Sequence, residues 1–430
     1  MTRALFRILF SALAALAGLG LSAQQTEVVL SATSGSKLVL AVAPPKVTGL
    51  DEASAARDFT DVLQRDLDET GVFGLLKEKL PTATDPASYK AWKEAGAQWL
   101  LTTRLTKAPG GEVQLEASAI DTNAEKVVFT KPYKADRLVP LRRLAHALSD
   151  DLVFQLTGVR GVASSRIVFV RQLSPGVKEI FQVDRDGANV LQLTRNGSLS
   201  LSPSVASDGR LAYVTYKGGA PAIWGQRTAG GAQVKLYEAA GGGMVSSPDW
   251  SPDGKRLAFV QGDRRGNTDI MVLDLATGHV RRLTDGSGIN TEPSWNPDGT
   301  QIAFTSDREG GPQVFLMQSD GSNLRRLTNE GTYNASPAWS PNGAMIAYVS
   351  RFEGKFDLFI YKLGEGKAYQ ITTGVNTSES PAWSPDERRL VFTSNRFGSM
   401  QLFTTDLSGR QVVRLSDLTN CQSPAWTRAR

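Results

Sequence analysis

The feature that most constrains this chain is a proline that returns at nearly even intervals through its second half. Each of these prolines follows a serine or a glutamate, and successive ones are separated by 45, 45, 44, 44 and 43 residues. The six are Pro203, Pro248, Pro293, Pro337, Pro381 and Pro424. A fixed period in the low forties, with four short strand-like runs in each unit, is typical of a β-propeller.

The unit around Pro293 shows how each repeat is built. Its first run ends at Trp295, and the turn at 296–299 has a proline that presets φ and an Asp-Gly pair that supplies the positive φ of a tight hairpin. An alternating run at 302–305, a third run at 313–317 and a short fourth run complete it. Five of the eight tryptophans occupy this repeat position, which suits a large side chain packed between blades.

The proline in the first run of every unit indicates where that run lies in its sheet. Proline has no N–H to donate to a strand ladder, so it is tolerated mainly on a sheet edge. The innermost strand of a propeller blade is such an edge, because it lines the central channel. We therefore expect the Pro–Trp runs to line the channel, and the loops that enter them to open at one mouth of it.

The number of blades follows from counting the second run of the unit. Its six starts are Ile167, Leu211, Leu257, Ile302, Ile346 and Leu390. The array begins on a second-type run at Ile167 but ends on a first-type run at Trp426. We expect the last run to complete the blade that Ile167 begins, which closes the ring and removes open sheet edges. The prediction is an all-β six-bladed propeller over residues 161–430.

The part of the chain before the repeats divides into three segments. Residues 1–23 carry basic residues followed by an apolar run that is short for a membrane span, so we interpret them as a cleaved signal peptide. Residues 24–36 are polar and small, and we expect a flexible segment. Residues 37–160 mix strand-like runs with helical periodicity, which predicts an α/β domain. Strands are expected at 38–42, 72–76, 99–103, 113–120 and 127–133, and helices at 51–69, 87–96 and 138–157.

The composition favours an exported protein that does not insert into a membrane. Apolar residues make up 41% of the chain, enough for packed cores, and no second apolar segment of spanning length follows the first. The single cysteine, Cys421, allows no internal disulfide, so stability must come from packing. The formal charge is +5, but basic residues are scattered without a dense cluster, which argues against nucleic acid as a partner. We expect a soluble monomer.

Sequence motifs for catalysis and metal binding are scarce. No Gly-x-Ser-x-Gly motif occurs, and the two histidines, His146 and His279, fall in a helix and a turn, where structural or exposed positions are expected. The run 184–189 resembles a calcium loop but lacks the downstream bidentate glutamate and fits the hairpin turn of its repeat. We expect no catalytic residue, no metal site and no cofactor. The alternative is a hydrolase that uses Glu292 and Glu379 in the channel.

The loops that enter the Pro–Trp runs are the strongest candidates for a binding surface. They are rich in hydroxyls and amides, which suits adaptable hydrogen bonding to a protein or peptide. A single serine before proline is explained as a turn residue, but six such loops on one rim are equally well explained by a binding surface. The candidate partner-binding residues are Met244, Val245, Ser246, Ser247, Asn290, Thr291, Glu292, Ser336, Glu379 and Ser380.

The order of signal peptide, small α/β domain, short joint and six-bladed propeller resembles the TolB family, periplasmic proteins of the Tol–Pal system. The most specific pieces are Leu-Thr-Gly-Val-Arg-Gly at 156–161, Asn-Thr-Glu-Pro-Ser-Trp at 290–295 and the terminal Ser-Pro-Ala-Trp at 423–426. The resemblance extends over essentially all of the chain after the signal peptide. It rests mainly on the joint and the N-terminal part, because the repeat alone occurs in other propellers.

The resemblance implies a non-enzymatic periplasmic adaptor that supports outer-membrane integrity and constriction at cell division. It implies that the propeller mouth binds the peptidoglycan-associated lipoprotein Pal, with Met244, Ser247, Thr291 and Glu292 among the contacts. It also implies that the N-terminal region binds TolA, and that other outer-membrane or peptidoglycan-associated proteins can be partners. A propeller that binds cell-wall glycan in its channel is a further alternative.

Overall fold

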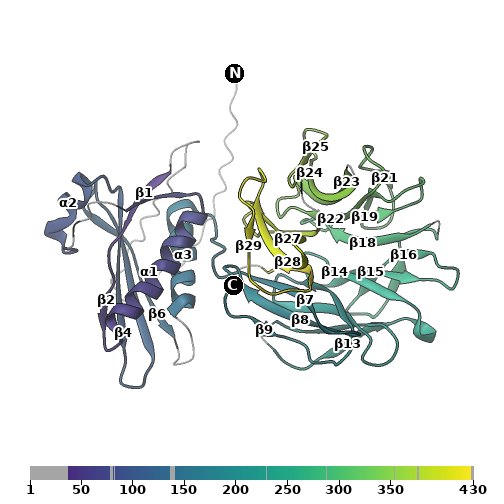
Figure 1. Cartoon of the computed structure of the whole chain (residues 1–430), viewed down its shortest axis with the longest axis horizontal. Coiled ribbons are helices and arrows are strands. Elements are labelled where there is room, and N and C mark those ends of the chain that lie inside the picture. The colour runs from purple at the N-terminus through teal and green to yellow at the C-terminus, as the bar shows by residue number, and fades with distance from the viewer. Residues whose placement is uncertain are drawn as a thin grey trace, which may run out of the picture.

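The structure is a computed structural model that describes residues 37–77, 81, 83–135, 141–228, 230–286, 288–352, 354–374 and 377–427. Two parts lie side by side: a mixed α/β layer structure and a ring of six four-stranded sheets (Figure 1). This confirms the predicted fold class, an α/β region followed by a six-bladed β-propeller. The predicted signal peptide and the segment 24–36 lie outside the described residues.

The N-terminal part is built on one six-stranded mixed sheet. Its elements are β1 (Leu38–Val42), β2 (Lys46–Thr48), α1 (Glu52–Glu69), β3 (Phe73–Leu76), the 3-10 turn η1 (Pro86–Ser88), α2 (Tyr89–Glu94), β4 (Trp99–Lys107), β5 (Val113–Asp121), β6 (Lys126–Ala135) and α3 (Leu141–Thr157). The strand order is β3-β1-β4-β5-β6, and β2 pairs with β4. The sequence analysis missed β2, which has three residues and no apolar alternation long enough to detect.

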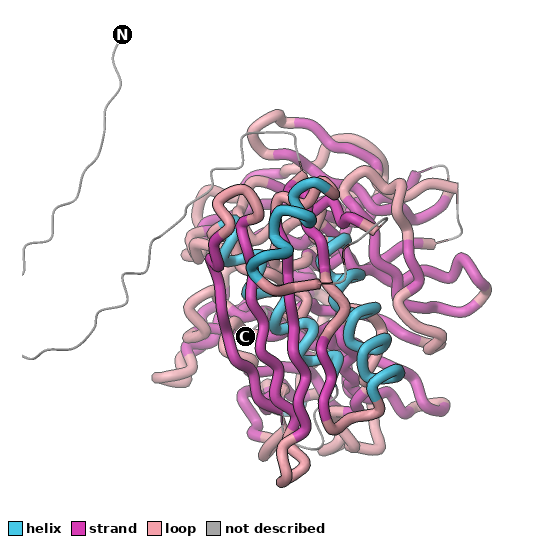
Figure 2. Tube along the Cα trace, turned by 90° about the vertical axis from the view of Figure 1, so that its left-hand side faces the viewer, coloured by secondary structure: helices cyan, strands magenta, loops and turns pink. Residues whose placement is uncertain are grey.

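Two long helices cover one face of this sheet and a short helix covers the other. Phe59 and Leu63 of α1 and Leu148 of α3 are buried against Leu101 and the other inward residues of that face. On the opposite face α2 buries Trp92 completely. Figure 1 shows α1 and α3 on the side nearer the propeller, and Figure 2 looks at the left-hand end of that view, with the long strands of the N-terminal sheet in the foreground. The outer surfaces of α1 and α3 therefore meet the propeller.

Each blade is an antiparallel sheet whose first strand is a Pro–Trp run. In blade order the strands are β10 (Ser200–Val205), β11 (Arg210–Thr215), β12 (Ala222–Arg227) and β13 (Val234–Glu238); β14 (Val245–Trp250), β15 (Arg256–Gly262), β16 (Thr268–Asp274) and β17 (Val280–Arg282); β18 (Asn290–Trp295), β19 (Gln301–Ser306), β20 (Gln313–Gln318) and β21 (Arg325–Arg326); β22 (Asn334–Trp339), β23 (Met345–Phe352), β24 (Lys355–Lys362) and β25 (Lys367–Gln370); β26 (Ser378–Trp383), β27 (Arg389–Phe397), β28 (Ser399–Asp406) and β29 (Val413–Arg414); β30 (Cys421–Trp426), β7 (Arg166–Ser174), β8 (Val177–Asp184) and β9 (Leu191–Gln192). In blade 1, which consists of β10–β13, Val205 stands in place of the tryptophan. A 3-10 turn, η2 (Ala240–Gly242), precedes β14.

The sixth blade joins the two ends of the ring. β30 pairs antiparallel with β7, with Cys421 opposite Arg171 and Trp426 opposite Ile167. Just after β30, the N–H of Thr427 donates to the carbonyl of Arg166, the first residue of β7, at 2.8 Å. This is the closure that the out-of-phase start of the repeats predicted. Through it the first and last strands of the array pair with each other, so that neither is left as an open sheet edge.

The repeated tryptophans pack between neighbouring blades, as their shared repeat position predicted. The guanidinium of Arg256 in blade 2 lies over the ring of Trp295 in blade 3, 4.8 Å from its centroid. The indole N–H of Trp383 donates to the carbonyl of Ala338 in the preceding blade at 2.9 Å. Each tryptophan thus belongs to the seam between two blades as much as to its own strand.

A bulge interrupts each inner strand at the residue before its proline. The pairing with the second strand shifts register there in all six blades. The bulged residue has a φ between 48° and 54°, which L-residues adopt rarely and a following proline restricts further. The six are Ser202, Ser247, Glu292, Ser336, Ser380 and Ser423. A Ser-Pro pair alone does not specify this conformation, so the sequence analysis did not anticipate it.

Asp150 of α3 clamps the joint between the two parts. Its carboxylate accepts the N–H of Ala163 at 2.6 Å and that of Ser164 at 2.9 Å. Gly161 passes so close to the helix that a Cβ there would lie 2.4 Å from the Cα of Asp150. Gly158 has a φ of +72°, which ends α3 with a left-handed residue. The joint is therefore held against α3 and is not a free linker.

Candidate functional site

The six inner strands enclose a cavity of about 400 Å³ along the axis of the propeller. The Pro–Trp runs line it, which confirms the position that their prolines predicted. All six inner strands run in the same direction, so their bulged residues lie toward one mouth and their last residues toward the opposite end. The lining consists mainly of hydroxyls, prolines and indoles, and includes the carboxyls of Asp249 and Glu292.

Side chains one position after the proline link neighbouring inner strands. Asp249 accepts the N–H of Trp295 at 2.8 Å and the hydroxyl of Ser204 at 3.0 Å. In the next blade, Oγ of Ser294 accepts the N–H of Trp339 at 3.3 Å. Burial raises the pKa of Asp249 to about 6, although its hydrogen bonds oppose that rise. Asp249 is therefore a link between three blades that titrates at mildly acidic pH.

Two carboxylates and a tyrosine lie together at the mouth beside blades 3, 4 and 5. Glu292 accepts the hydroxyl of Thr305 at 2.9 Å, and the N–H and hydroxyl of Ser336 at 2.7 and 2.8 Å. Burial, with the nearby charge of Glu292, raises the pKa of Glu379. Burial and both carboxylates also raise the pKa of Tyr333. These two carboxylates favour a partner group that is cationic or donates hydrogen bonds.

Exposed apolar side chains surround the same mouth. Met244 and Ile289, which are 48% and 49% exposed, precede the inner strands of blades 2 and 3. Leu173, Phe352 and Phe397 lie at the ends of second strands and are 48%, 49% and 65% exposed. Adjacent strands are antiparallel, so the loop into a first strand and the hairpin after a second strand open on the same side of the ring. Large apolar side chains gathered on one face are typical of protein-interaction surfaces.

The ten candidate binding residues do not all reach the surface. Those that are at least partly exposed are Met244, Ser246, Ser247, Thr291, Glu292, Ser336, Glu379 and Ser380. Val245 is 1% exposed and packs in the core between blades 1 and 2. Asn290 is fully buried, where it donates to the carbonyl of Thr268 and accepts from the guanidinium of Arg308. The expectation that Val245 and Asn290 face a partner is corrected, because the first residue of these strands points into the blade.

The sequence analysis missed several residues at the mouth, among them Tyr333, Phe352 and Phe397. Aromatic residues also form the cores of the blades, so these three did not stand out. In the repeat, Phe352 takes the hairpin position held by Arg308 in blade 3, and Phe397 that held by Glu309. An aromatic residue that replaces a charged one in a hairpin is the signal that could have identified them.

The other predicted features of chemistry lie away from this mouth. The calcium-like run 184–189 is the turn between β8 and β9, closed by the N–H of Gly187 on the carbonyl of Asp184 at 2.9 Å. His146 is buried in α3, and His279 is exposed in the turn before β17. In the part of the chain that the structure describes, no helix is long and apolar enough to cross a membrane.

Comparison with known families completes the picture of the fold. The family model for the TolB beta propeller domain matches residues 153–430, more than half of the chain, and that for the TolB amino-terminal domain matches residues 26–128. The chain belongs to the TolB family. The resemblance inferred from the joint and the repeats is thereby confirmed.

Individual TolB proteins are similar to parts or nearly all of this chain. The Protein TolB homolog of Chlorobium chlorochromatii is 34% identical over 273 residues, which cover 62% of this chain and 60% of that protein. The Tol-Pal system protein TolB of Desulfosudis oleivorans is 32% identical over 249 residues, covering 55% of each. The chain thus spans less than two thirds of the length of these two relatives. The crystal structure of TolB from Acinetobacter baumannii is 26% identical, with a TM-score of 0.75 over 91% of this chain and 97% of that one.

Proposed function

We propose that this protein is a periplasmic component of the Tol–Pal system that acts as an adaptor and not as an enzyme. Membership of the TolB family supports this, as does the similarity to a protein named as a Tol-Pal system protein. In this role the protein, as a monomer without membrane insertion, supports outer-membrane integrity and constriction at cell division. The observation that carries the proposal is the mouth of the propeller, where apolar side chains surround an acidic, hydroxyl-rich centre.

In this proposal the mouth binds the peptidoglycan-associated lipoprotein Pal. Exposed apolar residues such as Met244 and Phe397 provide area to bury, and Glu292 and Glu379 provide specificity through charge. Thr291 lies between the rim and the bulged Glu292, so a partner segment that contacts Glu292 from the mouth lies next to it. The second partner in the proposal is TolA, bound through the N-terminal region, whose residues 24–36 lie outside the described residues.

A hydrolase that uses the channel is the alternative from another class. It would need Glu292 and Glu379 as an acid–base pair. Glu292, however, already accepts three hydrogen bonds from Thr305 and Ser336, which hold it as a link between blades 3 and 4. The described lining of the channel includes neither histidine nor cysteine, so an activated nucleophile would have to be a serine without an imidazole base. These contacts argue against Glu292 as a catalytic acid or base.

The test is an affinity pull-down from periplasmic extract with the wild-type protein and the Thr291→Arg variant. We expect wild type to retain a lipoprotein that has a peptidoglycan-binding domain, identified by mass spectrometry. We expect Thr291→Arg to lose it at an unchanged melting temperature, because the substitution adds bulk and charge at a half-buried surface position. Retention should fall by at least tenfold, as for the loss of a central interface contact of about 1.4 kcal/mol or more.

Gln411→Arg is the matched control, since it adds the same side chain at an exposed position in the β28–β29 hairpin, which opens at the opposite end of the ring. It should retain the lipoprotein as wild type does. If the lipoprotein also binds Thr291→Arg, the adaptor function stands and the mouth is not the site. If the extract yields no such lipoprotein and the protein is instead saturated by cell-wall fragments, the glycan-binding alternative replaces the adaptor.

A further inference from the structure

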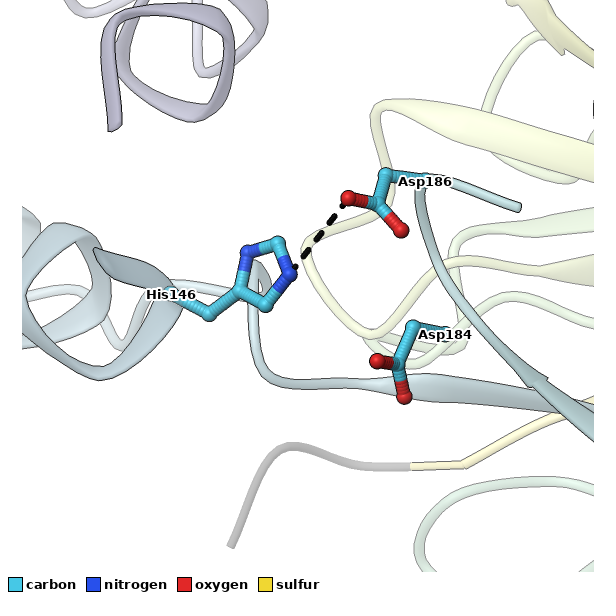
Figure 3. Close-up of side chains that lie close together, drawn as sticks. All are labelled: His146, Asp184 and Asp186. Carbon is cyan, nitrogen blue, oxygen red and sulfur yellow. Dashed lines mark ion pairs between the residues drawn. The ribbon is translucent and has the colours of Figure 1, made fainter. Parts of the chain in front are cut away.

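A buried cluster of charged side chains lies where the helices α1 and α3 meet the propeller. His146 of α3 is 3% exposed and stands between Asp66 of α1 and Asp186 of the β8–β9 turn. Its Nδ1 lies 2.5 Å from Oδ2 of Asp66, and its Nε2 lies 3.5 Å from Oδ2 of Asp186. Figure 3 shows the imidazole of His146 directed at Asp186, with Asp184 beside it. One ring thus contacts both parts of the molecule.

The protonation state of His146 determines whether the contact with the propeller is attractive. A carboxylate only accepts hydrogen bonds, so Nδ1 must donate its N–H to Asp66. In the neutral ring Nε2 then carries no proton, and its lone pair faces Asp186. In the protonated ring Nε2 also bears an N–H, which points at that carboxylate. Nε2 is buried and has no hydrogen-bond partner in the structure, so its 3.5 Å contact with Asp186 is an ion pair that exists only when the ring is protonated. The neutral ring therefore sets a buried lone pair against a carboxylate, whereas the protonated ring attracts that carboxylate.

The charges around His146 favour the protonated form. Four carboxylates, of Asp66, Glu69, Asp184 and Asp186, gather here with three guanidiniums, of Arg142, Arg166 and Arg185. Four negative charges and three positive ones leave a net charge of −1, which a proton on His146 neutralises. The groups just beyond are Arg65 on α1, Asp150 on α3, Asp386 on the turn before β27, and Arg389 on β27.

We propose that protonated His146 holds the α1–α3 layer on the propeller, so that pH determines how tightly the two parts are docked. A buried group whose charged form is stabilised on docking takes up a proton when the parts meet. The charges of Asp66 and Asp186 raise the pKa of His146 above its usual value, although burial opposes the rise. Asp66 belongs to the same part as His146, so the charges that docking adds are those of Asp186 and Asp184. Docking is therefore strongest at pH below the pKa of the undocked histidine and weakens as pH rises through the higher pKa of the docked state.

A bound metal ion is the competing explanation for a histidine beside two aspartates. The carboxylate oxygens of those aspartates are already occupied. Asp184 accepts from Asn189 at 2.6 Å and pairs with Arg166, and Asp186 accepts the N–H of Ala188 at 3.1 Å and pairs with Arg142. A cation would have to displace a guanidinium, whereas a proton leaves every one of these bonds in place. The geometry therefore favours the proton.

The first experiment uses the fact that the chain has two histidines. In protein labelled with ¹³C at histidine Cε1, the buried His146 and the exposed His279 give two NMR signals, and His279 is the internal reference. We expect His146 to titrate at least one pH unit higher in wild type than in Asp186→Asn, which removes the carboxylate on the propeller side. One unit corresponds to a tenfold change in the docking equilibrium.

The second experiment measures docking by hydrogen exchange at pH 6.0 and 8.5, corrected for the intrinsic pH dependence of exchange. We expect the protection of residues 142–150 and 184–189 to fall about tenfold in wild type, and that of β19 to stay constant. His146→Gln keeps an N–H donor that does not titrate, so its protection should not depend on pH. His279→Gln should behave as wild type.

Three outcomes would overturn the proposal. One is interface protection in wild type that does not change between the two pH values. Another is a His146 titration that is the same in wild type and Asp186→Asn, a comparison that stands even if His146→Gln does not fold. The last is a His146 signal that moves with micromolar Zn²⁺ and returns with a chelator at constant pH, which would make the cluster a metal site.

Discussion

At the scale of single residues, Asp249 shows how one carboxyl makes the propeller sensitive to pH. Its raised pKa, about 6, means that the folded protein binds this proton more tightly than the unfolded chain, where an aspartate titrates near 3.9. The contribution of this proton to the free energy of unfolding is fully present below about pH 3.9 and is lost as the pH rises through about 6.

Asp249→Asn should remove this dependence, because the amide cannot ionise and can still accept from Trp295 and donate to Ser204. In urea unfolding at pH 4.5 and 7.5, we expect the variant to gain about 2 kcal/mol relative to wild type at the higher pH. This free-energy change is smaller than the full conversion of a two-unit pKa shift, because Asp249 borders the water of the channel. A difference between the two proteins that is constant from pH 4.5 to 7.5 would contradict this role.

At the scale of elements, β30 decides whether the ring is closed. It carries Cys421, which is fully buried, and burial raises the pKa of its thiol to about 12. Thiol reagents need both access and the thiolate, so neither condition is met while β30 pairs with β7. The single cysteine of the chain is thus a natural reporter of the seam.

We expect Cys421 to react with a thiol-specific chromogenic reagent at pH 8 at least a hundredfold more slowly in native buffer than in 6 M guanidinium. The residual native rate then measures how often β30 separates from β7. Cys421→Ser combined with Ser408→Cys, at an exposed hairpin position, should react at once in native buffer and controls for the reagent. Equally fast reaction of the native wild-type protein would show that the seam is open.

At the scale of the whole molecule, the joint sets how the α/β part meets the propeller. Gly161 allows residues 161–164 to lie against α3 within reach of the carboxylate of Asp150, and the charged cluster around His146 extends the same interface. The mouth lies at the other end of the inner strands, about 20 Å away for a six-residue strand. The propeller thus has two separate surfaces, the mouth at which we propose that a partner binds and the face that meets the N-terminal part.

Gly161→Ala should destabilise the molecule, because its Cβ would lie 2.4 Å from backbone of α3 and the joint would have to move. We expect a cost of about 2–3 kcal/mol in the free energy of unfolding, measured by urea titration, as for overpacking at a rigid contact. Gly364→Ala, where an added Cβ meets nothing within 4 Å, should cost much less. Equal effects of the two substitutions would mean that the close approach at the joint is not rigid.

The sequence by itself determined the features that repeat or that follow chain periodicity. The spacing of the prolines set six blades and the inner position of the Pro–Trp runs, and the phase of Ile167 against Trp426 set the closure. Helical periodicity located α1 and α3, and the joint and repeats identified the family. These features are predictable because each depends on a local residue pattern or on the equivalence of positions in successive repeats.

Only the tertiary structure decided the features that depend on which segments meet in space. It placed Val245 and Asn290 inside the blades, turned the residue before each proline to a positive φ, and gathered Phe352 and Phe397 at the mouth. It also brought His146 and Asp186, which are far apart in the chain and unremarkable alone, into one buried cluster. A residue pattern shows which face of a helix or strand is apolar. The charge and burial of a side chain depend on neighbours that other elements supply.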